Sequence, residues 1–207
     1  MKKKMVWLKV SFFFLIVFAV FTYLARAQIF KEFDFNTTIR LQKHISTRFD
    51  TVFSVFSLIG SFEIVSIIFL GIIIARKKLF SLFAFAPFLA AHFLETIAKA
   101  FFYHPGPPFT FFRYNLSFLF PSSYIQPGSS YPSGHSLRAA FISVIFFFLL
   151  KNSKLKTNAK IILFILLCLF DAVMLISRVS LGEHWTTDVI GGAILGLATA
   201  FSAWLFL

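Results

Sequence analysis

Long apolar segments separated by short polar or basic turns dominate the chain. A membrane hydrocarbon core about 30 Å thick needs about 20 apolar residues per helical span. Segments of this kind lie at about 6–24, 59–75, 79–101, 133–150, 161–176 and 185–207. The pattern predicts an all-α, polytopic membrane protein with six transmembrane helices, and we expect them to form one domain over residues 1–207.

A mixed segment at 25–58 separates the first two predicted spans. Apolar residues recur in it at helical spacing with charged residues between them. The apolar positions are Ile45, Phe49, Val52, Phe53 and Phe56. We expect an amphipathic helix here that lies at the outer membrane interface and leads into the second span.

The first apolar segment begins like a secretory signal peptide, since it follows three lysines and precedes Ala25-Arg26-Ala27. It is longer than the about 7–15 apolar residues of a signal peptide, which favours an uncleaved span. Cleavage after this segment stays open as an alternative.

Composition supports the membrane class and excludes others. Apolar residues make up 58% of the chain and charged residues only 14%, and phenylalanine occupies 33 positions. Disordered chains are poor in aliphatic and aromatic residues, so disorder is excluded. Because Cys168 is the one cysteine, a disulfide scaffold is excluded as well.

The net charge of +12 is distributed as in a membrane protein. Much of the excess lies at 2–4, 76–78 and 151–160, three clusters without acidic residues. Lys and Arg collect on cytoplasmic loops, so both termini are predicted to be cytoplasmic, and the segments 102–132 and 177–184 to lie outside. We therefore expect a multi-pass protein of the cell (inner) membrane with no nucleic-acid partner.

Ionisable residues inside predicted spans are costly and are candidates for function. His92, Glu95 and Lys99 share one face of a helix by their spacing. The simplest interpretation is a Glu95–Lys99 pair that neutralises itself. Asp171 lies two turns before Arg178 and is a candidate partner for it. We assign Glu95 and Asp171 a supporting role.

Two polar clusters lie at predicted outer ends of spans. In the first, Pro132-Ser133-Gly134-His135 indicates a helix N-terminus with Ser133 near the cap, and Arg138 follows one turn later. Free amides and the helix dipole make such an end suitable for an anion. An ordinary helix cap with an interfacial histidine is the plain alternative.

The second cluster runs from Ser177-Arg178 to His184 and Asp188. On a helix that begins near Glu183, the Asp188 carboxylate can hold the His184 imidazole. This contact fixes the tautomer and leaves the other ring nitrogen free as a nucleophile or base. An interfacial His–Asp pair without chemistry is the alternative.

Together the clusters predict a phosphate site on the outer face. Cations beside a helix N-terminus can bind phosphate, and two histidines can act as nucleophile and general acid. The cations are Lys99, Arg178 and Arg138. A metal site is the rival, but it usually needs more carboxylate or imidazole ligands and fewer cations. We expect phosphoryl transfer with no metal and no other cofactor.

These residues resemble the type 2 phosphatidic acid phosphatase family, the membrane relatives of the vanadium haloperoxidases. The family carries K-x6-R-P, then P-S-G-H, then S-R-x5-H-x3-D. The second and third blocks are complete here, ending at His135 and Asp188. The first departs from the pattern, because Gly106 stands where the arginine after Lys99 is expected. We hypothesise that Arg138 supplies the missing charge. Weaker candidates are His104 and Arg113.

The resemblance implies a two-step mechanism in which His184, oriented by Asp188, attacks phosphorus and forms a phosphohistidine. His135 would protonate the leaving group. The phosphate oxygens would be held by Lys99, Arg178, Ser133 and the Gly134 amide, with Ser177 in support.

A site at the membrane interface indicates a lipid phosphate substrate, because the lipid chain can stay in the bilayer. Undecaprenyl or another polyprenyl diphosphate, phosphatidic acid and phosphatidylglycerol phosphate are open candidates for the substrate. The oligomeric state is open as well.

Two other classes of protein stay open. One is a catalytically inactive lipid-binding or transport protein on the same scaffold. The other, disfavoured by the neighbouring cations, is a serine protease using Ser133 or Ser177.

Overall fold

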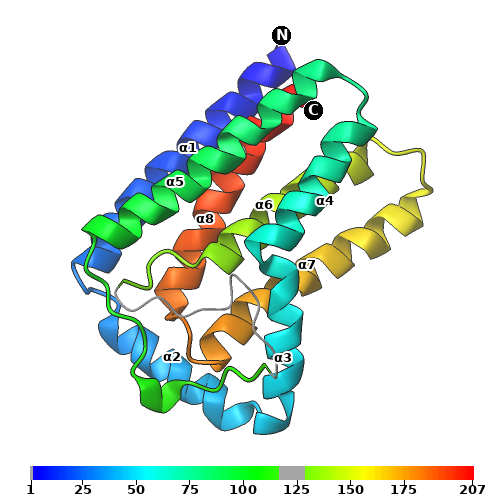
Figure 1. Cartoon of the computed structure of the whole chain (residues 1–207). Coiled ribbons are helices and arrows are strands. Elements are labelled where there is room, and N and C mark those ends of the chain that lie inside the picture. Colours follow the sequence, from blue (N-terminus) through cyan, green and yellow to red (C-terminus); the bar gives the residue numbers. More distant parts are fainter. Residues whose placement is uncertain (1, 117–128) are drawn as a thin grey trace.

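The computed structural model describes residues 2–116 and 129–207, and this part of the chain is helical (Figure 1). The helices are α1 (Lys2–Arg26), α2 (Lys31–His44), α3 (Asp50–Ser57), α4 (Phe62–Ala75), α5 (Phe85–Phe101), α6 (Gly134–Lys151), α7 (Thr157–Ser180) and α8 (Thr186–Ala203). Within the described ranges, the β-pairing consists of one isolated bridge between Pro105 and Ser129. The predicted all-α class is confirmed.

In the described part of the chain, five helical segments are long and apolar enough to cross a membrane. They are Lys4–Arg26, Leu79–Phe101, Gly134–Lys151, Thr157–Ser180 and Thr186–Phe206. Thr47–Gly60 and Phe62–Ala75 meet the same test only together, bent by 43°, and make a sixth span when the pair is counted as one. The bend falls where Ser61 is extended and its Oγ accepts a hydrogen bond from the Ile64 N–H at 3.3 Å, capping α4. The multi-pass membrane class is thus confirmed, and the predicted span 59–75 is the second half of a bent unit.

The segment between α1 and α4 differs from the prediction of one amphipathic helix. It holds two helices, α2 and α3, separated by extended residues Ile45 and Ser46 and a short 3-10 turn. In α3 the buried side chains are Ser54 and Ser57, whereas Val52 is exposed. The apolar stripe of α3 therefore faces outward, as expected for a helix in contact with lipid chains. Placement of α2 at the membrane interface stays a prediction.

The fifth span is longer than predicted, since α7 continues through Ser177 and Arg178 to Ser180. All three of these residues are buried, so packing extends the helix into the segment expected to be a turn. The turn before α8 is correspondingly short.

Helix α8 lies at the centre of the molecule, packed against α6, α1 and α5 (Figure 1). Its contact with α6 is close enough to involve the backbone. A Cβ added to Gly192 would lie 2.2 Å from the Ser133 carbonyl oxygen, so glycine is required there. The Ser133 N–H also donates to the Asp188 carbonyl at 2.9 Å. These contacts fix the first turn of α6 against the first turn of α8.

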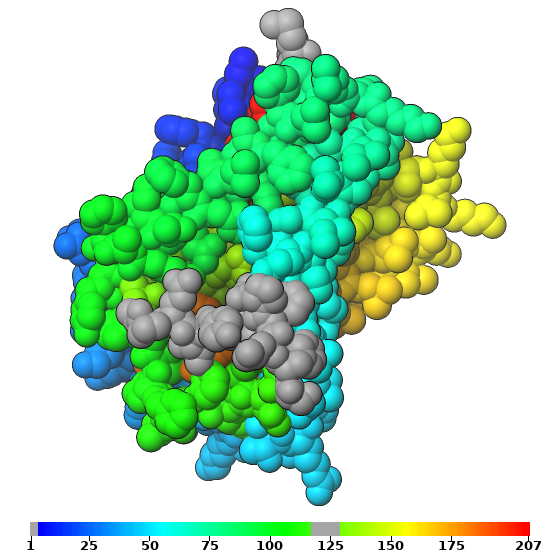
Figure 2. Space-filling model, in the orientation of Figure 1, coloured from blue at the N-terminus to red at the C-terminus, as the bar shows by residue number. Residues whose placement is uncertain are grey.

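Both termini lie at one end of the molecule, and α2, α3 and the segment that follows α5 lie at the other (Figure 1). Near the termini, Arg76 donates to the Leu207 carbonyl, and Lys4 Nζ donates to the Leu205 carbonyl at 2.9 Å. In the space-filling view, the segment after α5 covers the end away from the termini, beside α3 (Figure 2). The two polar clusters identified in the sequence, at the starts of α6 and α8, lie toward this second end.

Candidate functional site

The Ser-Gly-His segment forms the first turn of α6. Ser133 is the N-cap residue, and its side chain makes no capping hydrogen bond to the helix. Its Oγ instead accepts from Ser136 Oγ at 3.3 Å. The first amides of a helix have no intrahelical partner. Gly134 and His135 are buried in this turn, so their amides form a small, water-poor group of donors.

A charged cluster on α5 lies against this turn. Glu95 Oε2 is 3.2 Å from His92 Nδ1, and Glu95 Oε1 accepts from Lys99 Nζ at 2.6 Å. The predicted shared face of the three residues is confirmed. A Cβ on Gly134 would lie 2.4 Å from Glu95 Oε1, which shows how closely the carboxylate approaches α6.

Arg138 also reaches this cluster. Its Nη1 lies 3.7 Å from Glu95 Oε2, and its Nε donates to the Gly60 carbonyl at 2.7 Å. The break between α3 and α4 leaves that carbonyl available. Glu95 therefore faces two cations, and the interpretation of a self-neutralising Glu95–Lys99 pair is incomplete.

Arg178 is buried, with 1% of its surface exposed, and its Nη2 pairs with the Glu183 carboxylate. Its Nε and Nη1 have no hydrogen-bond partner among residues 2–116 and 129–207. The Tyr114 ring lies 5.7 Å from Cζ. A buried guanidinium with free donors is suited to bind an anion.

Asp171 is not the partner of Arg178, so that prediction is wrong. The Asp171 carboxylate accepts from Ser143 Oγ of α6 at 2.8 Å. Seven residues of α-helix span about 10 Å, too far for the pair, whereas the chain after α7 turns back and brings Glu183 to Arg178.

His184 lies just before α8, which begins at Thr186 rather than at Glu183 as expected. Its Nδ1 is 3.5 Å from Asp188 Oδ2, and the same oxygen accepts from the Trp185 N–H at 2.8 Å. The carboxylate thus both caps α8 and faces the imidazole. Burial lowers the pKa of His184 below its usual value, and the positive charges of Arg178 and Lys99 lower it further. The Asp188 carboxylate raises this pKa but does not outweigh them. The imidazole is therefore neutral at neutral pH.

The second oxygen of Asp188 faces His104, a weaker candidate for the missing charge whose contact with Asp188 the sequence did not indicate. His104 Nε2 lies 3.2 Å from Asp188 Oδ1. Burial opposes charge on His104, but the hydrogen bond and charge of Asp188, with Asp34, outweigh it and raise the pKa of His104. Its place in the first family block, two residues before Gly106, was the available signal.

Asp34 is a second residue that sequence reasoning missed. It is buried on α2 and accepts from the Thr187 N–H at 2.8 Å and from Thr187 Oγ1 at 2.6 Å. A cavity of about 270 Å³ adjoins it, lined by Ala25, Gln28, Phe30, Lys31, Asp34, His104, Pro105, Gly106, Pro108 and Trp185. Gly106 thus lines this cavity, and among the described residues an added Cβ would meet only Ser130, at 3.4 Å.

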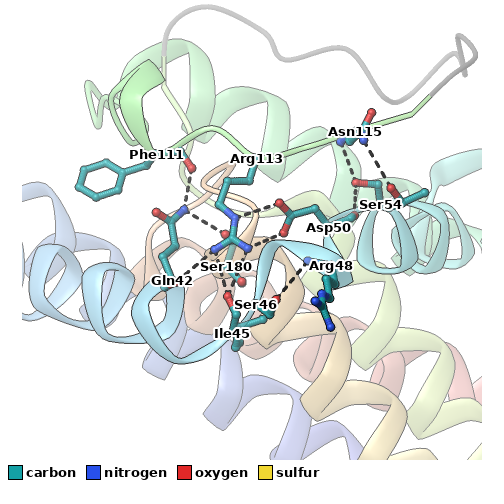
Figure 3. A network of polar contacts seen from close by, with 11 residues as sticks. Gln42, Ile45, Ser46, Arg48, Asp50, Ser54, Phe111, Arg113, Asn115 and Ser180 are labelled. Atoms are coloured by element: carbon teal, nitrogen blue, oxygen red, sulfur yellow. Dashed lines mark hydrogen bonds and ion pairs between the residues drawn. The ribbon is translucent and has the colours of Figure 1, made fainter.

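Arg113 is not available to replace the missing arginine. Its Nη2 and Nε donate to the two oxygens of Asp50 at 2.7 and 3.0 Å, and its guanidinium also donates to the Ile45 carbonyl (Figure 3). Gln42 Nε2 donates to the carbonyls of Phe111 and Ser180. This network ties the segment after α5 to α2, α3 and the end of α7.

The arrangement brings cations, two histidines and a helix N-terminus to one end of the molecule. Lys99 and Arg178 both act electrostatically on His184. In the part of the chain that the structure describes, no three His, Cys, Asp or Glu side chains are placed to hold a metal ion together. The chemistry that these groups can perform is nucleophilic attack by an imidazole on a bound phosphate.

Comparison with known proteins gives the family of the chain. Residues 78–207 match the model of the PAP2 superfamily. Phosphatidylglycerophosphatase B of Bacillus subtilis (strain 168) is 42% identical over 73 residues, which are 35% of this chain and 36% of that protein. The match thus spans about a third of that relative.

Two solved structures share the fold. One is the transmembrane PAP2-type phosphatidylglycerolphosphate phosphatase from Bacillus subtilis, with a TM-score of 0.73 and 23% identity, covering 94% of each chain. The other is LpxE of Aquifex aeolicus, with a TM-score of 0.58 and 21% identity, covering 83% of this chain and 94% of that one.

Proposed function

Because the chain belongs to the PAP2 superfamily, we propose that it is a lipid phosphate phosphatase that hydrolyses a phosphomonoester or diphosphate through a phosphohistidine, without a metal. The observation that carries the proposal is the buried Arg178 guanidinium, two of whose donor nitrogens have no hydrogen-bond partner among the described residues. It lies beside a neutral His184 that faces Asp188. A phosphate is the anion that uses both features.

In the first step, Nε2 of His184 attacks phosphorus while Nδ1 faces the Asp188 carboxylate. The bond from phosphorus to the lipid oxygen breaks, and His135 donates a proton to that oxygen. In the second step, water attacks the phosphohistidine, His135 accepts its proton, and inorganic phosphate leaves. The first step needs an unprotonated His184, which its lowered pKa supports, and hydrolysis of the bond between phosphorus and Nε2 in the second step regenerates that imidazole.

The phosphate oxygens are held where charge accumulates in the transition state. The holding groups are Lys99, Arg178, Ser133 and the Gly134 amide, with Ser177 and Glu95 in support. Arg138 supplies the charge absent at Gly106. Its Nη1 lies only 2.8 Å from where a Cβ of Gly134 would be, so it is close to the first turn of α6.

The proposed substrate is a glycerolipid or polyprenyl phosphate that reaches the site from the outer leaflet. The curated relative is named for phosphatidylglycerophosphate, which supports a glycerolipid. The site lies at the end opposite Arg76 and the chain termini. If the basic cluster at Arg76 is cytoplasmic, the site opens outside.

The test is release of inorganic phosphate in detergent with EDTA present, from lipid phosphates and diphosphates. We expect activity that survives chelation and is lost in His184→Ala. An acid-labile phosphoryl adduct on His184 should accumulate in His135→Ala with a good leaving group. An adduct on another residue would contradict the mechanism.

An inactive lipid-binding or transport protein is the second candidate, and Gly106 in place of the family arginine favours it. Wild-type protein that releases no phosphate from any lipid, yet moves a lipid phosphate between vesicle leaflets, would establish this alternative. In that case His184→Ala should leave lipid movement unchanged.

A further inference from the structure

Glu183 lies in the site with 9% of its side chain exposed, and none of the three family blocks specifies its identity. It directly precedes His184, in the short turn between α7 and α8. Its Oε2 pairs with Nη2 of Arg178, and its Oε1 has no hydrogen-bond partner in the described ranges. One phosphate-binding cation therefore already carries an internal carboxylate.

Lys99 is in the same situation, because its Nζ donates to Glu95 at 2.6 Å. A phosphate dianion that reaches Lys99 and Arg178 would lie close to two carboxylates. Like charges repel strongly in a buried site, where water does not screen them. Uptake of one proton by one carboxylate removes much of this repulsion.

The two carboxylates differ in how well their charge is compensated. Glu95 faces His92, Lys99 and Arg138, whereas Arg178 is the charged partner of Glu183. Other titratable or charged side chains around this end of the site are Glu63 on α4, His135 on α6, His184 next in the chain, and Tyr114 over Arg178. The proton is therefore expected on Glu183.

We propose that Glu183 sets the charge of the phosphate site, by taking up a proton when a phosphate dianion binds Arg178 and then donating its O–H to a phosphate oxygen. This role rests on the proposed phosphatase function. It makes Glu183 a specificity-determining residue for the charge of the anion. Independently, burial raises the pKa of Glu183 to about 7 although Arg178 opposes the shift, so the proton is accessible at neutral pH.

The test is sulfate binding by isothermal titration calorimetry at about pH 6 and about pH 8, because sulfate is a tetrahedral dianion that neither takes up a proton nor condenses in that range. The proteins are wild type, Glu183→Gln, and the matched control Glu32→Gln on the exposed surface of α2. We expect Glu183→Gln to bind about tenfold more tightly than wild type at the higher pH, because that pH lies about one unit above the Glu183 pKa of about 7 and proton uptake then weakens wild-type binding by about tenfold. The two should differ little at the lower pH, and Glu32→Gln should match wild type.

The imidazoles of His135 and His184 are common to all three proteins, so the difference between wild type and Glu183→Gln isolates Glu183. Sulfate binding that Glu183→Gln leaves unchanged at both pH values overturns this role alone. Absence of sulfate binding in wild type overturns the phosphate site as well.

A measurement on wild type needs no folded variant. Proton uptake on sulfate binding follows from calorimetry near pH 7 in two buffers with different ionisation enthalpies. We expect net uptake, and its absence overturns the proposal.

Discussion

His104 Nε2 lies 3.2 Å from Asp188 Oδ1, on the opposite oxygen from the one that faces His184. The aspartate thus stands between two histidines, one from the segment after α5 and one directly before α8. The contact with His104 can fix the position of the Asp188 carboxylate, and a fixed carboxylate orients the His184 imidazole more firmly. The negative charge of Asp188 is then shared between the two imidazoles. The arrangement makes His104 a positioning residue for His184.

His104→Gln should lower kcat by about tenfold, the scale of a positioning contact rather than of a catalytic group, with KM little changed. The pH profile should also change. Protonated His104 weakens the effect of Asp188 on His184, so its removal should raise the pKa of His184 and move the acidic limb of the rate profile to higher pH.

The matched control for this change is His44→Gln, because His44 is exposed on α2 and contacts only the Arg40 carbonyl. A purely structural role for His104 would lower activity without moving the acidic limb. The pH profile of kcat/KM therefore decides between the two roles.

The Arg178–Glu183 pair should matter for stability as well as for activity. Arg178→Ala leaves a buried carboxylate without its cation, and breaking a buried pair typically costs about 3–5 kcal/mol. We expect a lower Tm in detergent and no phosphate release. The double variant Arg178→Ala/Glu183→Gln should recover much of the Tm but none of the activity. A double variant as unstable as Arg178→Ala would mean that the pair is not the source of the loss.

Much of the site follows from sequence because its residues are held by regular helix geometry. The spacing of His92, Glu95 and Lys99 predicts that they share one face of a helix. The Pro-Ser-Gly sequence likewise predicts that α6 begins at Gly134. The partner of Arg178 could not be derived in this way. Glu183 reaches it through a turn whose path depends on packing between helices.

The error in the segment before α4 has a different physical cause. An apolar stripe at helical spacing looks the same whether it faces a protein core or lipid chains. In α3 the stripe that includes Val52 is exposed, and Ser54 and Ser57 are buried. Sequence periodicity therefore predicted a helix correctly but neither its boundaries nor the environment of its apolar face.

Asp171 gives a prediction from a corrected contact. Its carboxylate accepts from Ser143 on α6 and does not reach Arg178. Asp171→Asn should retain that hydrogen bond and leave kcat/KM within about twofold of wild type, as is usual for substitutions outside a reaction site. A large loss of activity, with the Tm unchanged, would return Asp171 to the site.

Arg138 and Gly106 provide the most direct test of how the chain compensates for its missing arginine. Arg138→Ala should lower kcat/KM by about a hundredfold, the typical effect of removing one group that stabilises transition-state charge. Arg40→Ala on the exposed surface of α2 is the matched control and should be silent. Gly106 lines a cavity, and among the described residues an added Cβ there would meet only Ser130, at 3.4 Å. Gly106→Arg should therefore fold, and in the Arg138→Ala background it should restore part of the activity. Phosphate release by Arg138→Ala at the wild-type rate would show that Arg138 is not the substitute.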